Sequence, residues 1–189
     1  MAASFPSAEI YHKSAASAHS FRGVYAATLL FTFHWALVAY VNSAYLAQFF
    51  SDQTIGALYA LGSLGTIVLL FFSAPLLRAF GTRALAGTLS AIEILSLIGL
   101  ALLPSRFAAV PLFLMHHALS PLAILVIDVF AEQHTGTEER RTGGARGALL
   151  VSGAAGIAFA ALIAGLLLEG DEPNFAFVYL ASALCMAAF

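Results

Sequence analysis

The chain has 189 residues, of which 61% are apolar, 8 are basic and 10 are acidic, with a formal net charge of −2 and a mean hydropathy of +0.91. About a quarter of the residues of a soluble domain are charged, so this composition excludes a soluble enzyme, a disordered tail and a nucleic-acid-binding protein. Cys185 is the only cysteine and lies in an apolar run, which excludes a disulfide scaffold. The class that remains is an integral membrane protein, with the lipid bilayer as its first partner.

Long apolar stretches follow one another along the chain. A helix needs about 20 residues to cross the hydrocarbon core. Five stretches meet this length, and a sixth is still apolar at Phe189, so we expect the sequence to be truncated within that span. Residues 92–103 are apolar on every face, unlike the alternating strands of a membrane barrel. The sequence therefore predicts an all-α integral membrane protein, a six-transmembrane-helix bundle with spans at about 24–50, 54–77, 84–103, 107–131, 148–168 and 175–189.

Basic residues predict the orientation of the spans. Seven of the eight precede the first span or lie in the loops after the second and fourth spans. The positive-inside rule places these segments in the cytoplasm. We therefore expect a multi-pass protein of the cell (inner) membrane, with residues 1–23 as a cytoplasmic N-terminal tail and residues 24–189 as one transmembrane domain.

Polar residues form a stripe on the first span. His34, Tyr45 and Gln48 fall within about 60° of one another on a helix, and Asn42 lies at the rim of the stripe. A polar side chain inside a membrane costs free energy unless it faces water or the protein interior. The stripe is equally consistent with one wall of an aqueous cavity and with hydrogen bonds between neighbouring helices.

The fourth span carries a similar face. His117 shares it with Pro121 and Asp128, Ser120 lies beside it, and His116 is expected to point elsewhere. These two spans predict a substrate pathway formed by His34, Asn42, Tyr45, Gln48, His117 and Ser120. Asp128 and Glu132 approach the cytoplasmic end, where arginines of the loops are expected to pair with them.

Glu93 lies near the middle of the third span. An isolated carboxylate at this depth is protonated or paired. Two interpretations stay open: a proton-coupling group, or a neutral, hydrogen-bonded acid that faces the bundle.

Small residues predict close helix packing on the second and fifth spans. The sequence contains no metal-ligand spacing, no phosphate-binding glycine-rich loop and no cysteine nucleophile. We therefore expect no catalytic residue, no metal and no cofactor. The packing residues are Gly62, Gly153, Gly156, Ala160, Ala164 and Gly165.

The loop between the second and third spans resembles a motif of the major facilitator superfamily (MFS). That family reads roughly G-x-L-x-D-R-x-G-R-R, and residues 74–83 read A-P-L-L-R-A-F-G-T-R, which keeps the Leu, Gly81 and Arg83. Arg78 stands where the family has its Asp, so the gating salt bridge of the family cannot be carried over. We expect Arg78 or Arg83 to pair with Asp128 or Glu132 instead.

The fifth span keeps part of the spacing of the antiporter motif of that family, with alanines in place of two glycines and without its Pro, so we infer no antiport. Six tightly connected spans and these two motifs resemble the N-terminal half of an MFS transporter. The resemblance implies two inverted three-helix repeats, with helices 1 and 4 along the pathway and helices 2 and 5 sliding against a C-terminal six-helix half. The motif positions on the fifth span are Gly147, Gly156, Ala160, Ala161, Ala164 and Gly165.

The function that this resemblance implies is secondary active transport of a small solute by alternating access, coupled to protons if Glu93 is a coupling group. The polar residues suit a sugar, a drug or a peptide equally. The alternative is a membrane protein without transport activity: a self-assembling six-helix scaffold, a channel or an intramembrane enzyme.

Overall fold

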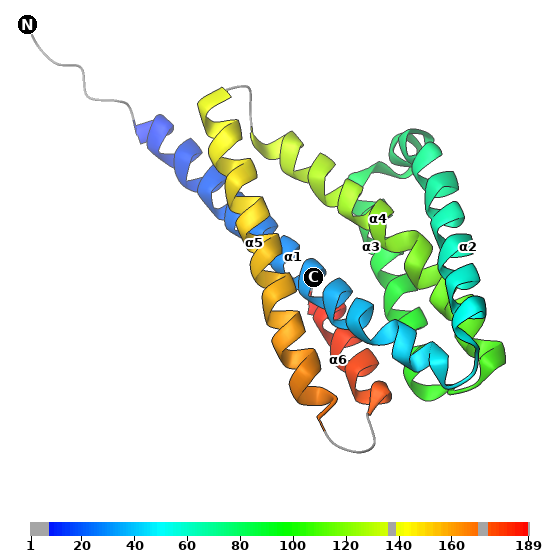
Figure 1. Cartoon of the computed structure of the whole chain (residues 1–189). Helices are drawn as coiled ribbons and strands as arrows, with labels where there is room; N and C mark the ends of the chain where they lie inside the picture. Colours follow the sequence, from blue (N-terminus) through cyan, green and yellow to red (C-terminus); the bar gives the residue numbers. More distant parts are fainter. Residues whose placement is uncertain (1–7, 136–138, 170–173, 189) are drawn as a thin grey trace, which may run out of the picture.

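The computed structural model describes residues 8–135, 139–169 and 174–188, and over these ranges it contains six helices and no strand (Figure 1). Five of the helices are long and apolar enough to cross a membrane, and the sixth is a shorter apolar helix. The six helices are α1 (Ala8–Ala47), α2 (Asp52–Phe71), α3 (Ser73–Leu102), α4 (Arg106–Thr135), α5 (Glu139–Leu167) and α6 (Phe175–Ala188). The chain is thus a multi-pass, all-α membrane protein, as predicted.

The helix boundaries differ from the predicted spans in two places. Helix α1 begins at Ala8, so residues that we assigned to the N-terminal tail continue the first helix. Helix α2 ends at Phe71, and a single residue separates it from α3. The break expected between the second and third spans lies inside α3, at Gly81, whose φ of 72° and ψ of 162° leave the helical region. This positive φ favours glycine, because a Cβ there would clash with the backbone.

Two ends of the bundle can be distinguished. Figure 1 shows the start of α1, the junction between α2 and α3, the end of α4 and the start of α5 at one end. This end carries Arg78, Arg83 and Arg146, and we call it the arginine end. The connections between α1 and α2 and between α3 and α4 lie at the opposite end.

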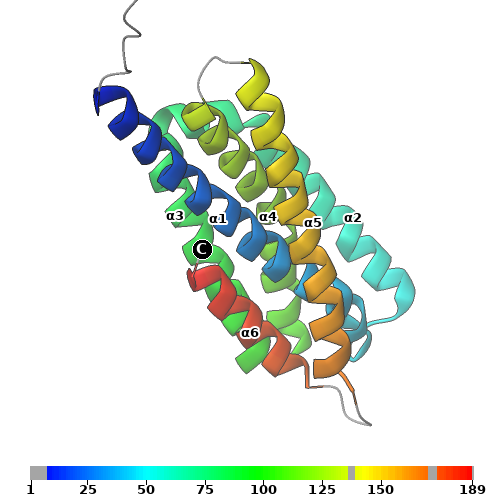
Figure 2. The ribbon, with the colours of Figure 1, turned by 90° about the vertical axis from the view of Figure 1, so that its left-hand side faces the viewer.

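The packing of the helices follows a twofold pattern. α1 packs on α5 as α4 packs on α2, and α3 packs on α4 as α6 packs on α1. α1 also contacts α4, and α3 contacts α6 (Figure 2). When α1, α2 and α3 are exchanged with α4, α5 and α6, the first four contacts map onto one another in pairs. The α1–α4 and α3–α6 contacts each map onto themselves. Because each repeat has three helices of alternating direction, corresponding helices run in opposite directions, and the domain consists of two inverted three-helix repeats.

Small residues lie inside the domain, between its own helices. A Cβ on Gly156 would lie 2.6 Å from the carbonyl oxygen of Leu29 and 2.9 Å from the backbone nitrogen of Phe33, so α5 can approach α1 this closely only with glycine here. Gly62 of α2 packs in the same way on His117 of α4. The glycine faces of α2 and α5, which we expected to slide against a second half, therefore hold the two repeats of this domain together. Gly153, Ala160 and Ala164 are also buried, whereas Gly165 is exposed.

Candidate functional site: a buried histidine cluster

A carboxyl group of α3 is held by two side chains of α4. Glu93 has no exposed surface, and its Oε2 lies 2.8 Å from Nδ1 of His116. The hydroxyl of Ser120 lies 2.7 Å from Oε1 of the same group and 2.8 Å from the backbone carbonyl oxygen of His116. His116 and Ser120 are four residues apart and therefore project from one face of α4. His116 and Ser120 are both buried, so each oxygen of the carboxyl group has a hydrogen-bond partner that is shielded from solvent.

A second histidine makes a similar contact between α1 and α6. Nδ1 of His34 lies 2.8 Å from the hydroxyl of Ser182, and this hydroxyl donates to the backbone carbonyl of His34 at 3.1 Å. Because the hydroxyl has a single proton, Nδ1 of His34 must be the donor in the shorter bond. In the neutral ring Nε2 then carries a lone pair, and this buried atom has no hydrogen-bond partner among the described residues.

The two histidine contacts correspond to each other when the repeats are exchanged. His116 and Glu93 join α4 to α3, and His34 and Ser182 join α1 to α6. The two rings meet edge to face, with their centroids 5.9 Å apart. We call His34, Glu93, His116, Ser120 and Ser182 the histidine cluster. It connects four helices from both repeats in the middle of the domain.

Two other polar residues of the first span bond to neighbouring helices. Tyr179 of α6 donates to the side-chain oxygen of Asn42 at 2.9 Å, and Tyr45 donates to the backbone carbonyl of Leu100 on α3 at 3.1 Å. The rings of Tyr45 and Tyr179 also meet edge to face, with centroids 5.1 Å apart. These buried bonds form a layer between the histidine cluster and the opposite end of the bundle.

Gln48 is exposed at the opposite end of the bundle. It lines a pocket of 340 Å³ between α1, α3 and α6, together with Tyr45 and Asn174.

His117 points toward α2, away from the histidine cluster. Its ring stacks on Phe113, meets Tyr59 edge to face at a centroid distance of 5.2 Å, and places Nε2 3.4 Å from the hydroxyl of Ser63. His117 is half-buried and Ser63 is exposed, so this group borders the surface between α2 and α4.

The structure thus distributes the six predicted pathway residues over three places. His34 and Ser120 belong to the histidine cluster, Asn42 and Tyr45 lie in the bonded layer, and Gln48 and His117 border the surface. Their contribution to a substrate pathway stays a prediction.

At the arginine end, Glu132 forms an exposed ion pair with Arg146 of α5, at 2.8 Å. Asp128 lies one turn earlier on α4 and is exposed. Glu132 thus pairs with one of the loop arginines expected at this end, because α5 begins beside the end of α4 (Figure 2). A pairing of Arg78 or Arg83 with Asp128 or Glu132 stays a prediction.

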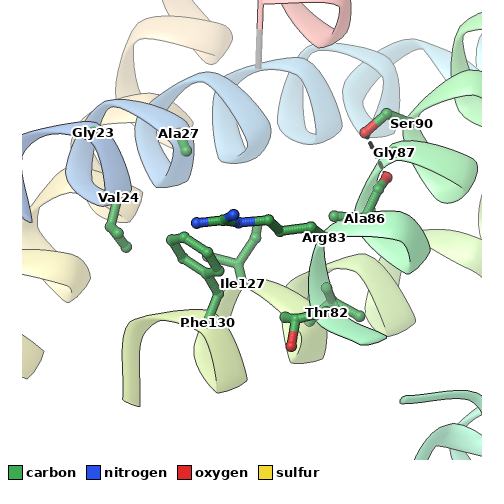
Figure 3. A pocket seen from close by; sticks show the side chains of 11 residues that line it. Gly23, Val24, Ala27, Thr82, Arg83, Ala86, Gly87, Ser90, Ile127 and Phe130 are labelled. Atoms are coloured by element: carbon green, nitrogen blue, oxygen red, sulfur yellow. Dashed lines mark hydrogen bonds between the residues drawn. The ribbon is translucent and has the colours of Figure 1, made fainter. Parts of the chain in front are cut away.

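Arg83 lines a cavity of 560 Å³ between α1, α3 and α4. Figure 3 shows its side chain extending across this space toward Phe130. Val24 and Ala27 of α1 close one side, and Ser90 of α3 marks its deepest point along that helix.

His116 and Ser182 are the functional candidates that the sequence reasoning missed. The angular argument compared polar residues within one helix, whereas these two residues meet partners on other helices. Glu93 carried the available signal, because a buried acid at mid-span needs a donor on a neighbouring helix. No group of three or more His, Cys, Asp or Glu in the described ranges is arranged to hold a metal ion.

Comparison with known proteins supports the resemblance drawn from the sequence. No curated protein and no solved structure matches the chain significantly. A family model, the MFS_1 like family, matches residues 15–179, which include parts of all six helices. The chain therefore belongs to the MFS_1 like family, a family of transporters of the major facilitator type.

Proposed function

We propose that this domain moves a small solute across the membrane by alternating access, as the first six-helix half of a twelve-helix secondary transporter. The observation that carries the proposal is the family match over residues 15–179, on a chain that folds as two inverted three-helix repeats. In transporters built from inverted repeats, the solute site lies near mid-membrane and the repeats rock around it.

The contacts between the repeats are suited to such rocking. α1 and α5 approach each other at Gly156, and α2 and α4 approach each other at Gly62. Small residues at a helix contact let the two backbones approach closely, and we propose that one helix of each pair rotates against the other at these points.

His117 and Gln48 are the predicted pathway residues that border the surface, and we propose that they contact the solute. His34, Asn42, Tyr45 and Ser120 are buried and bonded. Their contribution to transport would then be to hold the helices in position around the pathway.

The outer faces of α2 and α5 are apolar and exposed, and we propose that lipid and the second six-helix half cover them. Within a bilayer, exposed apolar side chains are the expected partners of acyl chains and of other spans. The exposed residues include Leu61, Leu64, Ile67 and Val68 of α2, and Leu150, Val151, Phe159 and Leu162 of α5.

Side-specific labelling tests alternating access without knowledge of the solute. Cys185, the only cysteine of this sequence, and any cysteine of the second half are replaced by Ser, and His117→Cys supplies one thiol beside Ser63. A membrane-impermeant maleimide is added to either face of sealed vesicles that contain the full-length protein. We expect label from both faces, because the two conformations expose this position in turn.

Asp52→Cys and Glu132→Cys are the matched controls, since these residues are exposed at opposite ends of the bundle. Each should react from a single face, and the two faces should differ. Label at position 117 from one face alone, or from neither, would instead support a static scaffold.

A further inference from the structure

We propose that the arginine end binds one anionic phospholipid, with the lipid phosphate on Arg83 and one acyl chain in the cavity beside this residue. The site is separate from the histidine cluster and from the predicted pathway residues. Binding of this lipid does not depend on transport, so it can be measured in the absence of any solute.

Two cavities meet at Arg83. The inner cavity is the space of 560 Å³ between α1, α3 and α4, and the outer cavity is a space of 440 Å³ at the break in α3 and the end of α4. Thr82, Arg83 and Phe130 line both. Figure 3 shows the guanidinium within the inner cavity, beside the ring of Phe130. A ligand with one charged group and two unlike ends therefore matches this arrangement.

Arg83 lies at the depth of the lipid phosphates. It precedes Glu93, near the middle of the third span, by ten residues, which is about 15 Å along the helix. The hydrocarbon core is about 30 Å thick, so its half-thickness is also about 15 Å. The exposed side chain of Arg83 is therefore at the border between acyl chains and headgroups.

The charge of Arg83 favours an anion within the cavities. A guanidinium stays protonated, and its planar set of donors matches the oxygens of a phosphate group. None of the described residues that line the two cavities is acidic, so their walls offer Arg83 no carboxylate. Asp128 is among the residues that line neither cavity, and a pairing of Arg83 with Asp128 is therefore the alternative to a phosphate here.

The inner cavity suits an acyl chain. It runs from Arg83 to Ser90, seven residues and about 10 Å along α3 toward the middle of the membrane. Helices α1 and α3 do not pack on each other in the described ranges, and no described residue of α6 lines the cavity. An acyl chain here would fill space that these helices leave open. The apolar walls include Val24, Ala27, Ala86, Val126 and Ile127.

The outer cavity suits an uncharged, hydroxyl-bearing headgroup. The hydroxyl of Thr82 donates to Oε1 of Gln133 at 3.3 Å, which leaves the side-chain NH₂ group of Gln133 as a donor for a headgroup oxygen. A headgroup amine would meet no acidic residue among those that line this space. Because an acyl chain is as apolar as the surrounding lipid, selectivity depends on the phosphate and the headgroup.

Native mass spectrometry of the delipidated full-length protein tests the site, with phosphatidylglycerol and phosphatidylcholine of the same acyl chains as probes. We expect one phosphatidylglycerol to bind the wild type more tightly than phosphatidylcholine. In Arg83→Gln the affinity for phosphatidylglycerol should fall about fivefold, the effect of losing one basic residue near a charged membrane surface. Arg78→Gln is the matched control, because Arg78 is exposed at the same end but lines neither cavity. It should keep the wild-type affinity.

Equal affinity of the wild type for the two lipids would overturn the proposal, and this outcome does not depend on the fold of any variant. An unchanged affinity in Arg83→Gln would overturn it as well. Inorganic phosphate is tested in a separate arm, and displacement of the lipid by phosphate alone would identify a free anion as the ligand. If another part of the full-length protein fills the inner cavity, no lipid is retained there and the proposal is wrong.

A second variant tests the place of the acyl chain. Gly87 lines the inner cavity, and the space around a Cβ built on it is open, so Gly87→Leu narrows the cavity without a clash. We expect this variant to lower the affinity for phosphatidylglycerol several-fold. Gly56→Leu, at an equally open position on α2, is the control and should bind as the wild type does. An unchanged affinity in Gly87→Leu would show that the acyl chain does not enter the cavity.

Discussion

The two repeats of this domain use the same contact for different chemistry. Each places a histidine against the third helix of the other repeat, at 2.8 Å from its partner in both cases. In one contact the partner is Glu93, and in the other it is Ser182. The comparison shows that the packing is shared by both repeats, whereas the charge belongs to one. The shared part explains the fold, and the difference between the partners should make the two contacts unequal in energy.

Removing the two partners should separate these contributions most clearly. Glu93→Ala leaves His116 without its acceptor, and loss of one member of a buried pair costs about 3–5 kcal/mol. Ser182→Ala removes a neutral hydrogen bond, which in membrane proteins contributes about 0.6 kcal/mol on average. Reversible unfolding in mixed micelles measures both losses. Equal losses would mean that the two contacts contribute equally to stability and that the carboxyl group of Glu93 adds nothing beyond a neutral hydrogen bond.

The two glycine contacts, at Gly156 and Gly62, should also differ in how much unfolding free energy is lost when the glycine is replaced by alanine. In Gly156→Ala the new Cβ meets backbone atoms of α1, which cannot rotate away, so overpacking should cost about 1–3 kcal/mol. In Gly62→Ala it lies 2.7 Å from Cδ2 of His117, a side chain that can turn, and we expect a smaller loss. Gly165→Ala, with open space around the added carbon, serves as the control in the same unfolding experiment. A greater loss at Gly62 than at Gly156 would contradict this account of the packing.

The break within α3 should have a moderate effect. Gly81→Ala places a Cβ at a φ of 72° and a ψ of 162°, a region open essentially to glycine alone, which costs an L-residue about 1–3 kcal/mol. Gly87→Ala is the control, because this glycine is on the same helix with ordinary helical geometry and open space. If both variants unfold at the same temperature, the positive φ at Gly81 is not required for stability.

The ion pair at the arginine end should contribute least. Arg146 and Glu132 are 65% and 63% exposed at their side chains, and exposed pairs are worth about 0–1 kcal/mol. Glu132→Gln should therefore change the unfolding free energy by less than about 1 kcal/mol, and the difference should shrink in high salt. A larger, salt-independent loss would give this pair a structural importance that its exposure does not suggest.

The sequence predicted the architecture well because each span is a local property. Apolar length located the helices, basic residues gave a consistent alternation, and Gly81 marked the break in the loop motif. Glu93 was identified as an unusual group at mid-span for the same reason.

The partners of Glu93 could not be predicted in the same way. On its own helix His116 lies off the polar face that contains His117, and Ser182 lies in an apolar run without a polar pattern. Which helix faces which follows from the packing of both repeats, and one helix contains no information about it. The same limit explains the salt bridge, since the arrival of Arg146 at Glu132 depends on where α5 starts beside α4.

The inverted orientation of the two repeats is the central claim, and side-specific labelling of corresponding loops tests it most directly. Asp52→Cys lies after the first helix of one repeat, and Gly144→Cys lies near the start of α5, after the first helix of the other. Both positions are exposed, and Cys185 is replaced by Ser in each variant. We predict that a membrane-impermeant thiol reagent labels these two positions from opposite faces of the membrane. Label at both positions from the same face would contradict the inverted repeats and the transport mechanism derived from them.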